Sequence, residues 1–376
     1  MSNQQEQLTN SEKVRRYRCP GCAADLLFEP QDGCLVCPYC GRREQIAARD
    51  DARVEERDYE EYLRLSDAQM TTLADDALEV QCQACGAVVT FTPPEVAGEC
   101  GFCGSKIVAQ AAAANPIVAP EGVLPFHVTQ ETATASIRGW LASLWFAPNA
   151  LKRLASQESI GGVYIPFWTY DAYTVTDYTG ERGEYYYVTE HYTERDAQGN
   201  DVQRTRQVRH TRWYSASGNV SRWFDDMLIP ATKSLPPERL AALEPWDLSA
   251  LKAYEPAYLS GYKAQRYQVN LPEGFELARQ SAAPVIESDV RKDIGGDEQR
   301  IHDLSTQYSA ITFKHLLLPV YVGAYRFNAK VYQVVVNGRT GEVQGERPYS
   351  VWKILFFVLF LLLVGGVLIF LFGSER

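Results

Sequence analysis

The chain has 376 residues, a formal net charge of −10 at pH 7 and nine cysteines. This length allows two or three domains, and the acidic balance disfavours general binding to nucleic acid, which attracts clustered Lys and Arg. Residues 1–14 form a polar stretch that we expect to be a mobile tail, and it contains no apolar segment of a secretory signal. We therefore expect reduced cysteines that bind metal rather than disulfides.

Two Cys-x-x-Cys pairs separated by fourteen residues occur twice, and the two copies lie 63 positions apart. The eight cysteines are Cys19, Cys22, Cys37, Cys40, Cys82, Cys85, Cys100 and Cys103. Two short turns brought together by a hairpin supply the four thiolates that a tetrahedral zinc ion prefers. The pattern predicts two zinc ribbons, ribbon 1 over 15–44 and ribbon 2 over 79–108, each with one structural Zn²⁺. Four thiolates close each site, so the metal is not expected to be catalytic.

The ninth cysteine, Cys34, aligns with Ala97 in the second copy. We interpret it as a small residue on a ribbon strand and leave it out of the ligands. In the alternative, Cys34 replaces Cys40 in an overlapping pair with Cys37, but that arrangement would break the repeat.

The segments around ribbon 2 differ in composition. Residues 45–78 have few glycines, no proline and many Ala, Glu, Arg and Leu, which predicts an acidic helical connector. Its thin apolar stripe consists of Tyr59, Tyr62 and Leu63, with Leu65 and Met70 as further candidates, and is expected to dock on the ribbons or to offer a face to a partner protein. Residues 109–120 form an Ala/Pro linker, and the main domain boundary is placed there.

Residues 121–349 predict a tyrosine-rich α+β domain. A helix is expected from about Thr129, because apolar residues then recur at spacings of three and four. Strands are expected over 163–178, 185–191 and 202–214, helices over 235–255 and 272–293, and a last β-unit over 311–343. The expected architecture is an antiparallel sheet with helices at its start and on one face.

A two-residue turn at Gly199-Asn200 would join two of these strands into a hairpin. In that register the paired residue numbers sum to 399, so that Glu190 faces Arg209 and Tyr187 faces Arg212. The pairing gives the basic strand a partial structural explanation, and a phosphate-binding strand is the alternative. Its basic residues are Arg204, Arg206, Arg209 and Arg212.

Residues 354–372 contain no charged and no polar side chain. As a helix they would span about 28 Å, close to the roughly 30 Å hydrocarbon core of a bilayer. The sequence therefore predicts a single transmembrane helix over 350–373 that contacts the bilayer through 354–372, with the amino-terminal domains in the cytosol. The full expectation is a multidomain chain with two small β zinc ribbons, an α+β antiparallel-sheet domain and one carboxyl-terminal transmembrane helix.

The common catalytic motifs do not occur in the sequence. There is no Gly-Lys dipeptide for a phosphate loop, no Gly-x-Ser-x-Gly and no His-Glu-x-x-His. The five histidines have no ligand spacing; they are His127, His191, His210, His302 and His315. We therefore expect no enzymatic activity.

Several stretches resemble a bacterial family of membrane-attached zinc-ribbon proteins, over roughly residues 15–372. They are the paired ribbons, 162–171 (GVYIPFWTYD), 318–321 (LPVY) and 336–348 (VNGRTGEVQGERP). Members often carry a label borrowed from the primosomal replication-restart helicase, or are described as having a ribbon like that of transcription factor IIB. The motor motifs of the helicase are missing here. Some similar proteins are encoded beside relatives of phage-shock protein A and hold such partners at the membrane, which implies scaffolding.

The leading hypothesis is a tail-anchored scaffold or adaptor of the bacterial inner membrane that presents its cytosolic domains to protein partners during envelope stress. A phage-shock-protein-A-like protein is the partner that the resemblance implies. The alternative is a nucleic-acid-binding accessory factor of replication or transcription, tethered to the membrane, which would use the ribbons and the strand Arg204–Arg212.

Overall fold

The computed structural model describes residues 17–46, 54–64, 78–81, 88–91, 97–99, 106–108, 118–148, 160–195, 199–327 and 330–373. One large antiparallel sheet dominates this part of the chain, with strands in the order β11-β10-β14-β15-β16. These strands are β10 (Gly161–Arg195), β11 (Asp201–Pro230), β14 (Glu298–Phe327), β15 (Lys330–Asn337) and β16 (Val343–Gly345). Short strands extend it: β4 (Arg57–Asp58), β9 (Gly122–Val123), β12 (Lys252–Ala253) and β13 (Lys263–Ala264).

Three of these strands are far longer than usual. β10 has 35 residues, and β11 and β14 have 30 each, whereas strands in globular proteins average about 5–6 residues. Alternating Thr, Tyr and Val side chains favour extended backbone along their length. The strands predicted separately over 163–178 and 185–191 are therefore one continuous strand. Beyond Gly183, β10 loses its neighbour β14 and continues with β11 as a two-stranded hairpin, which we call the arm (residues 184–195 and 201–212).

The predicted hairpin is confirmed, but its predicted register is wrong. Paired residue numbers sum to 396 in the arm, so Glu190 lies opposite Arg206 and Tyr187 opposite Arg209. The last pair is Arg195 with Asp201, which makes the connection longer than the two residues that Gly199-Asn200 suggested. A shift by three positions also changes which side chains share a face, because successive strand residues point to opposite faces.

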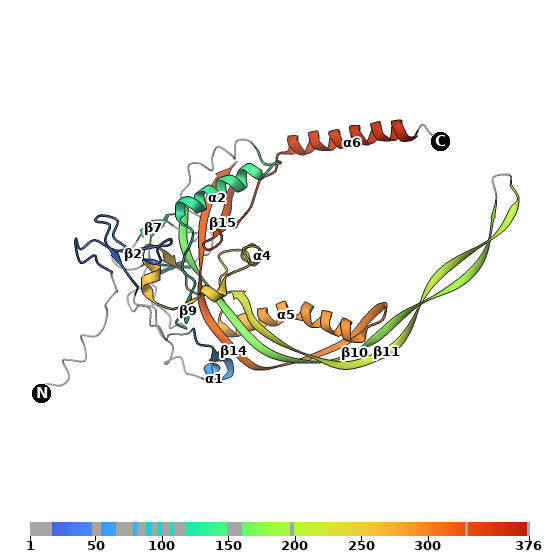
Figure 1. Ribbon diagram of the computed structural model, residues 1–376, viewed down its shortest axis with the longest axis horizontal. Coiled ribbons are helices and arrows are strands. Elements are labelled where there is room, and N and C mark those ends of the chain that lie inside the picture. The colour runs from blue at the N-terminus through green and yellow to red at the C-terminus, as the bar shows by residue number, and fades with distance from the viewer. Residues whose placement is uncertain are drawn as a thin grey trace.

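Helices cover the sheet in two places (Figure 1). Helix α5 (Leu271–Ile294) lies along the part where β10, β11 and β14 run together, and buries Phe275, Ala282 and Val290 there. Helix α2 (Gln130–Ser143) packs its buried face of Ala133, Ile137 and Leu141 in the core cluster at the β15 end. Both predicted helices are confirmed.

The remaining elements are short, apart from the last helix. Residues 235–255, predicted to be mainly helical, contain only α4 (Pro237–Ala241) and the 3₁₀ turn η2 (Leu248–Ala250). A second 3₁₀ turn, η3, covers Pro256–Leu259, and α1 covers Tyr59–Leu63. Of the connector expected to be helical, residues 47–53 and 65–77 lie outside the described residues.

The predicted fold class is wrong in two respects. The described part of the chain is mostly one large sheet, and ribbon 1 shares a single core cluster with it. Cys19, Leu26 and Phe28 of the ribbon lie in the same cluster as Val123 and Tyr164 of the sheet body. The physical reason is that a small ribbon has too little core of its own and buries its apolar side chains against the sheet.

The predicted transmembrane helix is also wrong. Among the residues whose side chains are described, no helix combines the length and the apolarity needed to cross a membrane. Helix α6 (Val351–Gly373) is described in its side chains only as far as Gly366. The predicted single-pass localisation in the inner membrane depended on this helix and is therefore wrong as well. The predicted bilayer contact of 354–372 depended on the same helix.

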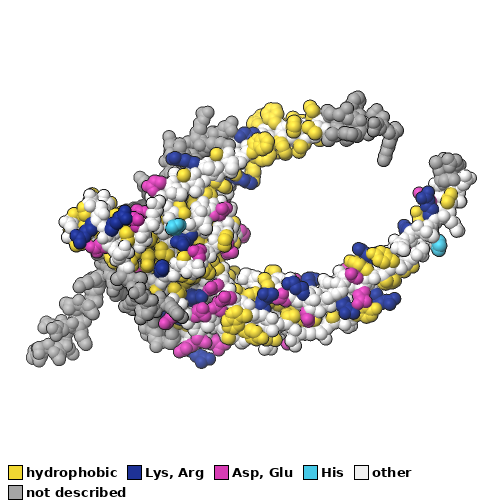
Figure 2. All heavy atoms as spheres, in the orientation of Figure 1, with side chains coloured by type: hydrophobic (Ala, Val, Ile, Leu, Met, Phe, Trp, Pro, Cys, Tyr) yellow, Lys and Arg dark blue, Asp and Glu magenta, His cyan; other side chains and the backbone are white. Residues whose placement is uncertain are grey.

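The first turns of helix α6 pack against the loop that follows α2. Phe357 contacts Phe146 at 5.4 Å between ring centroids, and the Lys353 ammonium donates to the Ala147 carbonyl at 2.8 Å. Beyond this contact the helix projects away from the body, so that α6 and the arm form the two ends of a C-shaped molecule (Figures 1 and 2).

Candidate metal centre and its surroundings

Ribbon 1 is a three-stranded sheet of β1 (Leu27–Glu29), β2 (Cys34–Val36) and β3 (Arg43–Glu44). Each cysteine pair lies in a tight turn that strand pairing closes: the bridge between Arg18 and Asp25 closes the first, and β2 with β3 closes the second. The residue after each second cysteine has a positive φ, 59° at Ala23 and 71° at Gly41. Glycine adopts this conformation without cost and alanine does not, so the turn at Ala23 is the more strained of the two.

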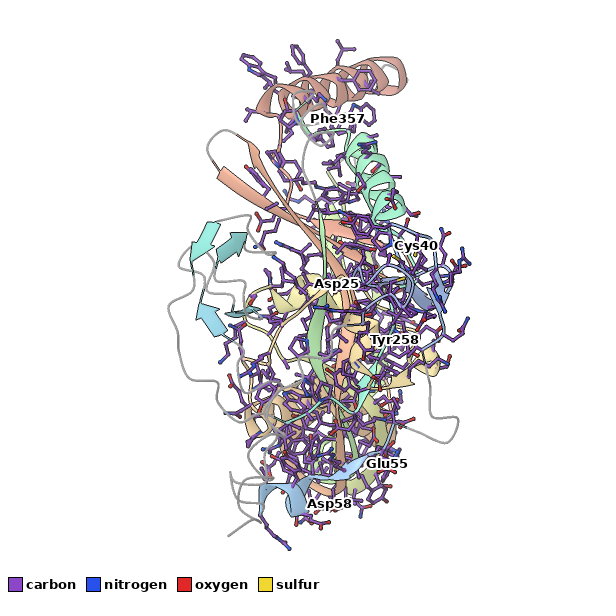
Figure 3. The ribbon with its side chains drawn as sticks, turned by 90° about the vertical axis from the view of Figure 1, so that its left-hand side faces the viewer. Asp25, Cys40, Glu55, Asp58, Tyr258 and Phe357 are labelled. Carbon is purple, nitrogen blue, oxygen red and sulfur yellow. The ribbon has the colours of Figure 1, made fainter. Side chains whose placement is uncertain are left out.

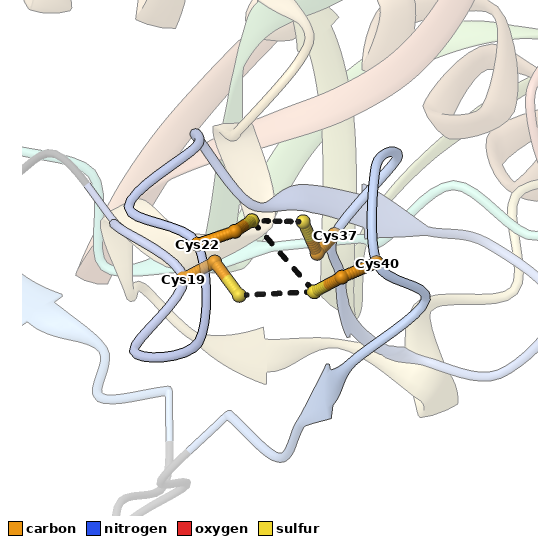
Figure 4. Close-up of side chains that lie close together, drawn as sticks. All are labelled: Cys19, Cys22, Cys37 and Cys40. Carbon is orange, nitrogen blue, oxygen red and sulfur yellow. Dashed lines mark hydrogen bonds between the residues drawn. The ribbon is translucent and has the colours of Figure 1, made fainter.

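The two turns bring four sulfur atoms together (Figure 4). The Sγ atoms of Cys19, Cys22, Cys37 and Cys40 all lie within 4.8 Å of one another. Sγ of Cys19 lies 3.4 Å from that of Cys40, and Sγ of Cys22 lies 3.4 Å from that of Cys37 and 3.7 Å from that of Cys40. Ligands about 2.3 Å from a tetrahedral zinc ion stand about 3.8 Å apart. The cluster can hold a metal ion.

Backbone amides favour the metal-binding form of one thiol. The amide of Cys40 donates to the sulfur of Cys37, and this hydrogen bond lowers the pKa of Cys37 to about 6. A thiolate is the form that binds metal. Cys34 lies on β2 outside the cluster, as predicted, and burial raises the pKa of its thiol.

Ribbon 2 repeats the strand pairing of ribbon 1. Gln81 pairs with Val88, and Glu99 pairs with Lys106. Each pair lies 63 positions after its counterpart, Arg18 with Asp25 and Val36 with Arg43. These strands are β5 (Leu78–Gln81), β6 (Val88–Phe91), β7 (Ala97–Glu99) and β8 (Lys106–Val108). The predicted ligands Cys82, Cys85, Cys100 and Cys103 lie outside the described residues.

Ribbon 1 is seated on the segment around η3 (Figure 3). The Phe28 ring meets Tyr258 edge-on at 5.5 Å and Tyr262 at 6.5 Å. The Phe28 amide donates to the Ser260 carbonyl at 2.9 Å, and the Ser260 hydroxyl donates to the Leu26 carbonyl at 2.6 Å. The Tyr17 hydroxyl donates to Glu255 at 3.0 Å. Backbone and aromatic contacts therefore attach the ribbon to the body. The residues that make these contacts lie far apart in the sequence, so the sequence did not predict them.

The segment between the two ribbons crosses the edge of β14. Strand β4 pairs there through Arg57 with Phe313, and the Arg57 guanidinium lies 2.8 Å from Glu121 Oε1. The other Glu121 oxygen accepts from the amide of His315 at 2.5 Å. Burial raises the pKa of Glu121 to about 7 despite the nearby Arg57, and burial lowers the pKa of His315 to about 4.

Glu121 should make the protein less stable as pH rises. Its pKa is higher in the folded state, about 7, than its ordinary value of 4.5, so the folded state binds more protons within this window. The favourable contribution is complete below pH 4.5 and is lost as pH rises to about 7. We expect wild-type protein to lose about 2.5 kcal/mol of unfolding free energy between pH 5 and pH 8 relative to Glu121→Gln.

Denaturant unfolding at a series of pH values measures this difference. His315 has the opposite sign, because its lowered pKa costs stability below pH 6.5, and that contribution is common to wild type and Glu121→Gln. Parallel pH profiles for the two proteins would contradict the expectation.

The arm exposes aromatic and aliphatic side chains. Tyr186, Val188, Tyr192 and Val202 are all exposed and share one face of the hairpin, while Tyr187, at 62% exposure, lies on the other. Figure 2 shows apolar and basic side chains interspersed along this slender extension. Exposed apolar groups gathered on one element are typical of an interaction surface.

The four arginines of the basic strand have partners within the arm. Arg204 and Arg206 form ion pairs with Glu194 and Glu190, at 3.0 and 2.9 Å. Arg209 lies over the Tyr185 ring at 4.2 Å, and Arg212 lies over the Tyr186 ring at 5.0 Å. The four arginines therefore contact side chains within the arm, but their partners differ from those of the predicted register.

Comparison with known proteins yields one relative along almost the whole chain. A Bacillus subtilis (strain 168) protein named "Uncharacterized protein YdjG" is 26% identical over 340 residues, which are 90% of this chain and 91% of the relative. No family model matches the chain, and no solved structure matches it.

Proposed function

We propose that this protein is a zinc-ribbon scaffold or adaptor that presents a long β-hairpin arm to protein partners. The observation that carries the proposal is the arm itself, whose two faces are exposed and whose arginines are already paired. A hairpin that leaves the body without a neighbouring strand buries little surface of its own. A partner that covers Tyr186, Val188 and Tyr192 would supply that burial.

Zinc is the metal that this proposal places in ribbon 1. Four thiolates at these separations suit a structural zinc ion, which is closed to substrate. The strand register supports a second ion in ribbon 2, on Cys82, Cys85, Cys100 and Cys103. The metal would hold the amino-terminal part in shape, and the ribbon would then stabilise the body through Phe28.

A protein partner suits the arm better than nucleic acid. In the described arm, acidic residues accompany the arginines, and Arg204 and Arg206 are neutralised by glutamates. A nucleic-acid surface presents free Lys and Arg in a patch. A phage-shock-protein-A-like protein is the first partner to test, because the family resemblance implies it.

A shortened arm tests the proposal. Tyr186 pairs with His210, so replacing residues 187–209 with Asn-Gly gives a two-residue hairpin in the existing register. We expect the shortened chain to keep the metal and the fold of α5. It should no longer capture a purified phage-shock-protein-A-like protein. Undiminished capture by the shortened chain would overturn the arm as the binding surface.

The nucleic-acid alternative has its own measurement. Titration of the full chain with duplex DNA across a salt series should show weak binding with a shallow salt dependence. Tight binding whose logarithm falls steeply with the logarithm of salt concentration, and which Arg209→Ala weakens, would favour the accessory factor instead.

A further inference from the structure

The sheet bends near Asp171 of β10, because the two strands on either side of β10 each carry an extra residue there. β11 uses the residues from Phe224 to Met227 opposite Tyr170–Ala172 of β10, and β14 is shifted likewise opposite Asp171–Tyr173. In the two bulges, Asp226 and Ala310 each have a φ of 50°. Bulges bend a strand and increase its twist, and Figure 1 shows the sheet turning beside α1. We call this level the elbow.

One buried carboxylate on the central strand joins both bulged strands. Asp171 is 2% exposed. Its Oδ1 accepts from the backbone amide of Asp226 at 2.6 Å, and its Oδ2 accepts from the Thr312 hydroxyl at 3.1 Å. The Asp171 carboxylate therefore connects the backbone of the β11 bulge with the Thr312 side chain of β14.

Lys314 connects the elbow to the segment between the ribbons. Its ammonium, on a side chain 10% exposed, lies 2.7 Å from Asp226 Oδ1 and 3.1 Å from Glu56 Oε1. The Thr312 hydroxyl also lies 3.3 Å from Glu56 Oε2. Glu56 is thus the one described residue of the inter-ribbon segment whose carboxylate reaches this cluster.

Aromatic contacts hold the same segment in place. Tyr62 packs edge-on against Phe313 at 5.1 Å, and Tyr59 packs against Phe275 at 5.0 Å and Tyr170 at 6.3 Å. Tyr170 and Phe313 flank the bulges directly. The segment 54–64 therefore contacts the elbow through charge and through apolar surface.

We propose that segment 54–64 is a latch that fixes the elbow, and that its release lets the arm change direction relative to the body. Both ends of the latch lead towards a ribbon, ribbon 1 before it and ribbon 2 after it. The inference concerns regulation of the arm and rests on the proposed function of the arm as the partner-binding surface.

Distance measurement by double electron–electron resonance tests the latch in the full chain. Spin labels on encoded keto amino acids would replace Gln207 in the arm and Lys252 in the body, which leaves the cysteines unmodified. We expect a narrow distance distribution for the otherwise wild-type chain. Glu56→Ala and Tyr62→Ala should each lose that narrow population and give a broad distribution.

Glu60→Ala is the matched control, since Glu60 lies in the same segment, is exposed and pairs only with Arg64 at 3.7 Å among the contacts described. It should keep the narrow distribution. Glu56→Gln, a milder change, guards against misfolding. A narrow and unshifted distribution in Glu56→Ala and Tyr62→Ala, with unchanged circular dichroism, would overturn the latch. Because no partner is present in this experiment, such a result leaves the partner-binding role of the arm standing.

Discussion

Replacing Cys37 with Ser is expected to remove the metal from ribbon 1 and to release the ribbon from the body. Structural zinc contributes on the order of 10–16 kcal/mol in zinc-finger peptides, whereas a whole domain is stable by only about 5–15 kcal/mol. If ribbon 1 holds zinc as proposed, we expect the loss of that contribution to unfold the ribbon. Phe28 would then leave Tyr258 and Tyr262, and the aromatic cluster of the body would become accessible to solvent.

Elemental analysis and limited proteolysis measure these two effects. The metal content should fall by about one ion per chain, and new cleavage should appear within residues 17–46. Cys34→Ser is the matched control, because Cys34 lies on the same ribbon outside the sulfur cluster. A Cys37→Ser protein with full metal content, or a Cys34→Ser protein that loses metal, would contradict the assignment of ligands.

Asp171→Ala should strongly destabilise the sheet. It removes the acceptor of the Asp226 amide and of the Thr312 hydroxyl, and leaves Lys314 with less negative charge nearby. Removal of one member of a buried charged network costs about 3–5 kcal/mol. Denaturant unfolding followed by circular dichroism measures this loss.

Asp177→Ala provides the comparison on the same strand. Asp177 is exposed, so its removal should change the unfolding free energy by no more than about 0.5 kcal/mol. Equal effects of the two substitutions would show that Asp171 does not hold the elbow.

The sequence predicts the clustering of the four cysteines of ribbon 1 well, because the geometry of that cluster is local. Two Cys-x-x-Cys turns and one hairpin suffice to assemble the four sulfurs, and no distant residue is needed. The contact surface between ribbon 1 and the body could not be predicted in this way. Phe28 and Tyr258 are far apart in sequence, and nothing near either residue indicates the other.

The arm shows the limit of reasoning from turn residues. Gly199-Asn200 is a good two-residue turn, and a hairpin does form there, yet the strands end at Arg195 and Asp201. The register depends on the pairing of all the residues along β10 and β11, which a local turn preference does not decide.

Asp171 carried no signal that sequence reasoning could use. An aspartate after Tyr170 looks like one more polar strand position, and its hydrogen-bond partners, the Asp226 amide and the Thr312 hydroxyl, lie on two other strands. The prediction of a transmembrane helix over residues 354–372 depended mainly on hydropathy, and the described side chains of α6 do not bear it out.

The central claim is that the arm, rather than a ribbon, contacts the protein partner. Photo-crosslinking from two exposed tyrosines separates these surfaces: Tyr192 on the proposed partner-binding face of the arm, at 38% exposure, and Tyr39 on ribbon 1, at 83%. Each would be replaced in turn by a benzophenone amino acid in the full chain and irradiated with purified phage-shock-protein-A-like protein. The account predicts a crosslinked adduct from position 192 and none from position 39. An adduct from position 39 with none from position 192 would contradict it.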